Sequence, residues 1–221
     1  MSFYEQLTAS TQKERDQLLT VPIIADCLQG RVKLPDYHAF LSQAYHHVRH
    51  TTPLLMSLGG RLPERLAWLR PAVAEYIEEE IGHEEWILDD IRAAGGDADA
   101  VRASRPELPA ELMVAYAYDL VNRGNPAGFF GMVFVLEGTS VALALMAADR
   151  IQQGLQLPDA AFSYLRSHGT LDQEHTKHLA ELLEQMAPQD QQDVVRYARV
   201  FYRLYGDIFR ALSHPEAVPC N

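Results

Sequence analysis

The sequence predicts an all-α protein with a single domain over residues 1–221, built as a bundle of about eight helices. Apolar residues recur at helical spacing through most of the chain, and glycines and prolines separate these stretches. No stretch combines strand-like alternation with hairpin turns, and no internal repeat is visible. With 221 residues, of which 48% are hydrophobic, the chain is long enough for one large core but would divide into two small ones.

Three helical segments are expected in the first third of the chain. They share an apolar stripe with charged residues on the other faces, and they cover residues 2–19, 23–29 and 36–58. Pro35 fits the first turn of the third segment, where a missing N–H is tolerated. Pro53 predicts a kink or a break within it.

The rest of the chain predicts further helices that end at glycines and begin near prolines. Residues 72–94 form the first chemically unusual one, because this segment is rich in acids. The others share helical periodicity without acidic bias, and they cover residues 111–123, 126–153, 158–166, 171–186 and 189–212.

The formal net charge of −11 argues against two classes of partner. Nucleic acids and anionic membranes both bind basic surfaces, because cationic side chains release the counterions of phosphate groups. Cys27 and Cys220 are far apart and form no CxxC, so we expect neither a disulfide framework nor a thiolate zinc site. Residues 1–15 lack a secretory signal. We therefore expect a cytoplasmic protein with no nucleic-acid and no membrane partner.

Glu137 is the single ionisable side chain between Asn125 and Asp149. Apolar residues surround it on every face of the expected helix, so the helix is buried and the carboxylate is neutralised, paired or metal-bound. A membrane span is the weaker interpretation, because the chain has no second apolar run of this length and this one contains an acid. A Glu bonded to a buried Arg, Tyr or His is the alternative to a metal ligand.

Glu80 and His83 form an E-x-x-H pair in the acidic helix predicted over 72–94. Successive helical residues rotate by about 100°, so the two side chains share a broad face with Tyr76. This spacing lets a carboxylate and an imidazole from adjacent turns bind one ion, as in helical bundles that hold di-iron. A solvated acidic face is the common alternative. We keep only Glu80, or Glu79 in its place, as a carboxylate candidate.

The segment HGTLDQEH contains three further donors. On a helix, His168, Asp172 and His175 fall within about 40° of one direction, so three candidate ligands face the same way. A lone core histidine is usually only hydrogen-bonded, but three donors in this pattern favour a metal. Gly169 could interrupt the helix and displace His168.

Three expected helices thus offer three carboxylates and three histidines to one site. The six candidate ligands are Glu80, His83, Glu137, His168, Asp172 and His175. Imidazole and carboxylate donors without thiolates suit iron, or manganese in its place, better than zinc or calcium. Six such donors can hold two ions and leave positions for O2 and a substrate group. The residues therefore predict a ligand set for two iron ions.

The chain resembles the heme-oxygenase-like superfamily, which contains TenA, PqqC, CADD-type and UndA-type proteins. The stretches AYHHVRHTTPLL, EEEIGHEEWILDDI and HGTLDQEH, with the buried Glu137 between the last two, occur in the order that this family uses. The resemblance covers most of the chain and implies a heme-oxygenase-like helical bundle. Diiron members hold two irons with three histidines and three carboxylates and oxidise small molecules with O2. The resemblance thus implies a non-heme diiron oxidase that acts on a small molecule. The ligands that this implies are His83, Glu137, His168, Asp172 and His175.

One position departs from a pattern of this family. Some members place the first carboxylate seven residues before the first histidine, where this chain has Tyr76, and others use the shorter E-x-x-H. Glu80, or less favourably Glu79, is then the implied ligand. We expect His47, Tyr76 and Tyr45 to line the substrate pocket, with a hydrogen-bonded core histidine as an equal alternative for His47.

Other interpretations stay open. A ferritin-like four-helix bundle uses a similar order of donors, but residues 37–58 contain no acid in their interior and His168 would be superfluous. A metal-free PqqC-like oxidase or a TenA-like protein of cofactor metabolism keeps the same fold. A TenA-like thiaminase needs a pocket cysteine, and Cys27 and Cys220 lie outside the ligand-bearing helices. The acidic net charge argues against a regulator that binds DNA.

The apolar face of residues 189–212 is assigned to the core first and to a homodimer interface second.

Overall fold

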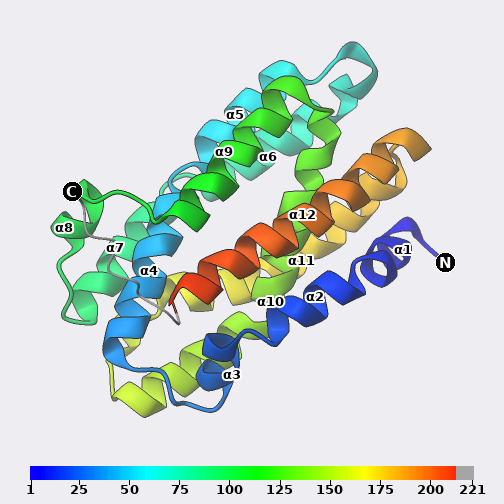
Figure 1. Cartoon of the computed structure of the whole chain (residues 1–221). Helices are drawn as coiled ribbons and strands as arrows, with labels where there is room; N and C mark the ends of the chain where they lie inside the picture. Colours follow the sequence, from blue (N-terminus) through cyan, green and yellow to red (C-terminus); the bar gives the residue numbers. More distant parts are fainter. Residues whose placement is uncertain (213–221) are drawn as a thin grey trace.

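A computed structural model describes residues 1–212, except for the side chains of residues 169–174. All regular structure in this part of the chain is helical, which confirms the predicted class (Figure 1). Three short 3-10 helices are present, η1 (Glu64–Leu69), η2 (Pro126–Gly128) and η3 (Asp159–Ala161). The α-helices are α1 (Phe3–Ser10), α2 (Gln12–Leu19), α3 (Pro22–Leu28), α4 (Leu34–Val48), α5 (Thr51–Arg61), α6 (Arg70–Glu80), α7 (His83–Ala93), α8 (Ala98–Ala103), α9 (Leu108–Arg123), α10 (Phe129–Leu155), α11 (Ser163–Glu184) and α12 (Pro188–Leu212).

The described residues contain twelve α-helices where the sequence predicted about eight, because several expected helices are divided. Residues 2–19 form α1 and α2. The segment expected over 36–58 divides between α4 and α5 at Arg49 and His50, not at Pro53. Pro53 instead occupies the first turn of α5, where its missing N–H costs no hydrogen bond.

The acidic helix expected over 72–94 is broken between the two residues of the E-x-x-H pair. α6 ends at Glu80 and α7 begins at His83. Gly82, between them, has φ +90°, a left-handed conformation that residues with a side chain rarely adopt. Helical rotation across this segment was therefore the wrong reason for placing the pair together, although Glu80 and His83 do meet.

α11 is continuous where the sequence predicted two helices, over 158–166 and 171–186. It runs from Ser163 to Glu184 across Gly169, so this glycine does not end the helix. A glycine inside a helix costs about 1 kcal/mol relative to alanine, which tertiary packing readily offsets. Continuity keeps His168 and His175 two turns apart on one helix.

α10 is the central helix and packs lengthwise against α11 and α12 (Figure 1). Gly131 of α10, with Gly128 at the end of η2 just before it, allows α12 to approach closely. A Cβ atom on Gly131 would lie 2.6 Å from the backbone oxygen of Val194, and one on Gly128 would overlap the ring of Tyr197. Gly128 and Gly131 therefore serve helix packing.

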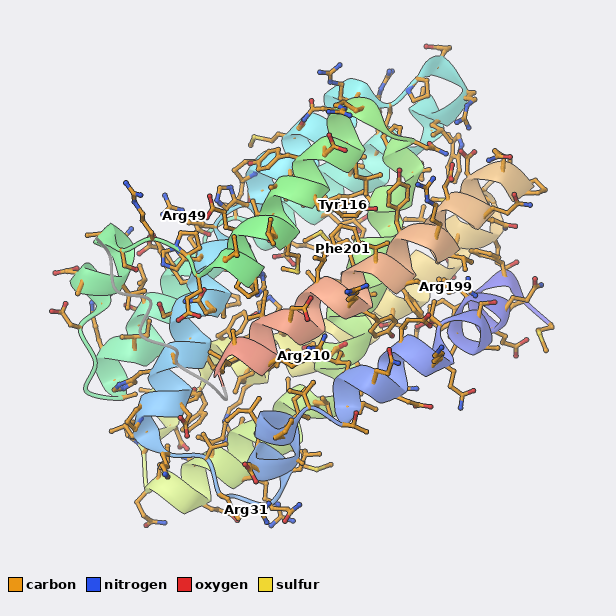
Figure 2. The ribbon with its side chains drawn as sticks, viewed as in Figure 1. Arg31, Arg49, Tyr116, Arg199, Phe201 and Arg210 are labelled. Carbon is orange, nitrogen blue, oxygen red and sulfur yellow. The ribbon has the colours of Figure 1, made fainter. Side chains whose placement is uncertain are left out.

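Residues 126–155 are long and apolar enough to cross a bilayer by length and composition. Half of the most apolar window of this helix is buried inside the protein, as in the core helix of a globular fold. The apolar face of α12 also belongs to the core. Figure 2 shows Phe201 of α12 opposite Tyr116 of α9, with ring centroids 5.5 Å apart.

Candidate metal centre

Three candidate ligands come together where α6, α7 and α11 meet. One donor atom from each of Glu80, His83 and His168 lies within 4.8 Å of the other two. The break at Gly82 allows this arrangement, since Glu80 ends one helix and His83 starts the next. We call this trio the first donor group.

Hydrogen bonds orient both imidazoles of the first donor group. Nδ1 of His168 lies 3.1 Å from the carbonyl oxygen of Tyr164, and it must donate because a carbonyl only accepts. Nδ1 of His83 lies 3.1 Å from Oε2 of Glu80 and donates to this carboxylate. In the neutral form the lone pair of each ring is then on Nε2. Histidine ligands are commonly held in this way by their other nitrogen.

A second donor group surrounds His175, further along α11. Its Nε2 lies 3.0 Å from Oε2 of Glu79, and its Nδ1 lies 3.6 Å from Oε1 of Glu137. Glu137 comes from α10 and is only 9% exposed, whereas the side chain of Glu79 is 42% exposed. Because both ring nitrogens face carboxylates, His175 fits either a doubly protonated imidazole or a cation shared with the two acids.

The Glu80 carboxyl stays acidic although it is buried. Burial raises its pKa, but the hydrogen bond from His83 and the nearby imidazoles of His168 and His175 act in the other direction, and the resulting pKa lies below the ordinary value. At neutral pH the site therefore contains a charged carboxylate with histidines as its close partners. A buried group of this composition suits a divalent cation.

The structure places five of the six predicted ligands in these two groups. The sixth, Asp172, lies on α11 among the residues whose side chains are outside the described part of the chain. Glu79 and Glu80, which the sequence offered as alternatives, point to different groups, Glu79 to His175 and Glu80 to His83.

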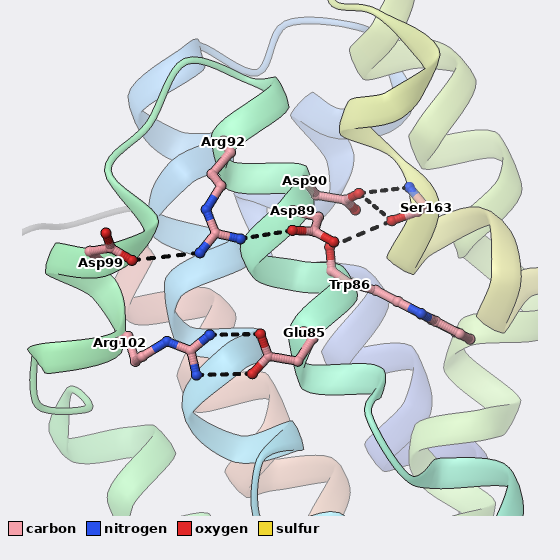
Figure 3. Close-up of polar contacts among 8 residues, drawn as sticks. All are labelled: Glu85, Trp86, Asp89, Asp90, Arg92, Asp99, Arg102 and Ser163. Carbon is pink, nitrogen blue, oxygen red and sulfur yellow. Dashed lines mark hydrogen bonds and ion pairs between the residues drawn. The ribbon is translucent and has the colours of Figure 1, made fainter.

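Sequence reasoning missed Trp86. Its indole stacks on the His83 ring, with centroids 4.0 Å apart and planes at 28°, and lies edge-on to His168 at 6.2 Å. Figure 3 shows the Trp86 side chain pointing away from the ion pairs that Arg92 and Arg102 make on the outer side of α7. Its position three residues after His83 on one helix was the available signal.

A cavity of about 180 Å³ adjoins both donor groups. Glu80 and His168 of the first group and Glu137 of the second line its wall. Most other lining side chains are aliphatic or aromatic. A molecule in this cavity would thus lie against the candidate ligands and be shielded from water.

Two of the three predicted pocket residues line this cavity. His47 and Tyr76 do so, and burial, followed by the nearby His168, lowers the pKa of His47 to about 4. Tyr45 is not among the lining residues, and its ring lies under the Arg49 guanidinium. Tyr45 and His47 are two residues apart on α4, so their side chains are rotated by about 200° from each other.

Cys27 lines the cavity from α3, although the sequence placed it away from the site. Burial raises the pKa of its thiol to about 11. The thiol is therefore protonated at neutral pH and is a weak nucleophile. Cys220 lies outside the described residues.

Residues 38–206 match the model of a family described as iron-containing redox enzymes. The chain belongs to this family. The matched segment contains every candidate ligand named above, and membership confirms the resemblance on which the sequence analysis relied. No curated protein sequence matches the chain significantly.

Solved structures show that this iron-containing redox family member has the heme-oxygenase-like fold. A domain of unknown function from Shewanella denitrificans, described as heme oxygenase-like, superposes with a TM-score of 0.86 and 23% identity, covering 97% of this chain and 93% of that one. A TenA homolog from Pseudomonas syringae superposes with a TM-score of 0.80 and 9% identity, covering 95% of this chain and 91% of that one. Heme oxygenase-1 from Synechocystis, in complex with heme, superposes with a TM-score of 0.76 and 10% identity, covering 97% of this chain and 94% of that one. At these identities the likeness concerns the fold, and it excludes the ferritin-like alternative.

Proposed function

We propose that this protein is a non-heme diiron oxidase that uses O2 to oxidise a small molecule held in the cavity. The observation that carries the proposal is the pair of donor groups, each with histidine and carboxylate, on the wall of one apolar cavity. Membership in an iron-containing redox family supports iron as the metal.

The donor chemistry fits two iron ions. Glu80, His83 and His168 would hold one ion, and His175 with Glu137 would hold the other, assisted by Asp172 or Glu79. Neutral imidazoles and charged carboxylates without thiolate suit ferrous iron, and manganese is the next choice. When bound, the metal would supply the electrons that reduce O2.

The residues around the site would position the reactants. Tyr164 holds the His168 ring through its carbonyl oxygen, and Trp86 holds the His83 ring by stacking. Both contacts reduce the freedom of the imidazoles before metal binds, which preorganises the ligands. The apolar wall excludes water, so the reacting bond of a substrate lies next to the donor groups in a low-dielectric space.

The test is iron content after anaerobic reconstitution with ferrous iron, in protein purified without chelators or a histidine tag. The variants are Glu137→Ala and His168→Ala, one from each donor group. Glu78→Ala is the matched control, since Glu78 lies two residues before Glu80 on α6 but is exposed. O2 consumption by the loaded proteins is then followed in an electrode cell.

We expect about two irons per wild-type and Glu78→Ala chain and fewer in both site variants, because each donor group loses a ligand. Faster O2 consumption by the loaded wild type than by free iron would support oxidase chemistry. Protein that stays metal-free after reconstitution would overturn the proposal. A metal-free PqqC-like oxidase or a TenA-like protein on the same fold would then be the leading account, favoured by the histidine and tyrosines of the cavity wall.

The cytoplasmic location, the homodimer and the absence of nucleic-acid and membrane partners stay predictions from the sequence. Nucleic acid would need a basic surface, which the net charge of −11 opposes.

A further inference from the structure

The cavity extends far beyond the donor groups, along α10. Lining residues on this helix recur at Glu137, Ser140, Ala144, Ala147 and Ile151, which is one face of an α-helix. Ile151 lies fourteen positions after Glu137, so the lined face is about 21 Å long at 1.5 Å per residue. The space next to the candidate metal centre is therefore elongated.

Aliphatic side chains predominate in the far part of the cavity, where Cys27, Asp36 and Tyr37 also line the wall. Ile24 and Leu28 of α3 and Val32, which precedes α4, lie across from Ala147 and Ile151 of α10. The small side chain of Ala147 leaves room along the helix, and the branched side chains provide the apolar contacts. This wall fits a hydrocarbon chain and offers few polar groups to a branched polar molecule.

No lysine or arginine lines the cavity among the described residues. The stretches 169–174 and 213–221 contain no lysine or arginine in their sequence, so they add neither. Figure 2 shows Arg31, Arg199 and Arg210 on the outside of the molecule. An anionic group of a ligand would thus find no lysine or arginine to offset the loss of its hydration, and the only basic side chains among the described lining residues are the imidazoles of His47 and His168.

Three carboxylic acids are among the described residues of the cavity wall. Glu80 and Glu137 line it at the candidate metal centre, and Asp36 lines it at the start of α4. These carboxylates repel an anion. With metal bound, the acids of the two donor groups would offset most of the ionic charge.

One buried hydroxyl supplies a neutral polar contact. The Oγ atom of Ser140 is buried, and it has no hydrogen-bond partner among the described residues. Ser140 lines the cavity three residues after Glu137. An uncharged hydroxyl or carbonyl of a ligand would satisfy it.

We infer that the cavity binds an elongated, uncharged aliphatic molecule, of the class of long-chain alcohols and aldehydes, and discriminates against the corresponding carboxylates. The inference rests on the proposed function only in taking this molecule as the substrate. Binding itself requires the cavity and its charge, and it is measurable without metal.

The test uses N-phenyl-1-naphthylamine, an uncharged dye whose fluorescence rises in apolar sites. Dodecan-1-ol and dodecanoate are compared as competitors at pH 7.5, below their micelle concentrations, on metal-free and on Co(II)-loaded wild-type protein. Ala147→Phe fills the far part of the cavity. Ala142→Phe is the matched control, because Ala142 lies on the same helix but is exposed.

We expect dodecan-1-ol to displace the dye at a concentration lower by at least about tenfold than dodecanoate does, because burying an unpaired carboxylate is costly. Ala147→Phe should weaken dye binding and leave Co(II) binding unchanged, and Ala142→Phe should change neither. The inference would be overturned if dodecanoate competed as well as dodecan-1-ol, or better, on the metal-free or the Co(II)-loaded protein. It would also be overturned if dodecan-1-ol could not displace dye bound to the wild type. Iron content is measured separately. Protein that binds the alcohol but takes up no iron would contradict only the diiron proposal, and protein that takes up iron but does not bind the alcohol would contradict only this inference.

Discussion

Asp90 on α7 and Ser163 at the start of α11 connect the two helices that carry His83 and His168. The buried Asp90 carboxylate accepts hydrogen bonds from the backbone N–H of Ser163 at 2.9 Å and from the Ser163 hydroxyl (Figure 3). It also accepts a hydrogen bond from the backbone N–H of Tyr164 at 3.0 Å. These bonds satisfy N–H groups that a helix start leaves without partners. The first donor group is therefore fixed by a cap outside it.

Replacing Asp90 should destabilise the protein strongly. Asp90→Ala leaves buried N–H groups without partners, and we expect the free energy of unfolding to fall by about 2–3 kcal/mol. Asp90→Asn, the matched control, keeps one carbonyl oxygen as an acceptor and should lose less. Urea denaturation followed by circular dichroism measures both. Equal losses in the two variants would show that the cap contributes little.

The glycines of α10 should differ sharply in their tolerance of alanine. At Gly131 a Cβ atom would lie 2.6 Å from the backbone oxygen of Val194, whereas at Gly138 nothing lies within 4 Å. We expect Gly131→Ala to lower the melting temperature, because α12 must move away. Gly138→Ala should raise stability by up to about 1 kcal/mol through helix propensity. Thermal melts of the two variants and the wild type measure these changes. A Gly131→Ala protein with the melting temperature of the wild type would contradict the close packing.

The helices followed from periodicity, but their divisions depended on backbone conformations that composition does not reveal. Gly82, with φ +90°, lies between two helices and precedes α7, whereas Gly169 lies within a helix, although the two glycines look alike in the sequence. Tertiary packing and caps decide between these outcomes, and Asp90, 73 residues before Ser163, is such a cap. Local sequence cannot show a partner at that distance.

The buried His47 should make stability depend on pH. Its pKa is lowered to about 4 in the folded protein, from an ordinary value near 6.5, so the unfolded chain binds more protons between these values. The stabilisation is present above pH 6.5 and is lost as the pH falls towards 4. Between pH 7.5 and 5 the metal-free wild type should lose about 2 kcal/mol more unfolding free energy than His47→Gln. Urea denaturation of both proteins at several pH values measures this, and parallel curves would contradict it.

The candidate site followed from residue types more than from geometry. Glu137 stood out as one acid in a long apolar run, and His168 and His175 by their spacing on one helix. Tyr45 was misplaced because the rotation from His47 was not applied to it. Trp86 was missed because an aromatic residue on an amphipathic helix usually indicates core, and its stacking on His83 exists only in three dimensions.

Trp86 should report metal binding at the first donor group. Its indole stacks 4.0 Å from the His83 ring, so a paramagnetic ion on His83 lies within quenching distance. In a Trp68→Phe background Trp86 is the only tryptophan, and most of its emission should be lost on titration with Co(II). Trp86→Phe, in which Trp68 remains, should show little change. Quenching that survives His83→Ala would place the ion elsewhere.

Glu80 and Glu79 should contribute unequally to metal binding. The Glu80 side chain is 11% exposed and accepts a hydrogen bond from His83, whereas that of Glu79 is 42% exposed. A buried ligand loses less interaction energy to solvent, so Glu80→Gln should weaken binding of the first Co(II) ion by about tenfold or more, and Glu79→Gln by clearly less. Visible absorption during Co(II) titration gives both affinities, with Glu78→Gln as the control. A larger loss in Glu79→Gln would assign the main ligand role to Glu79 and place the principal site around His175.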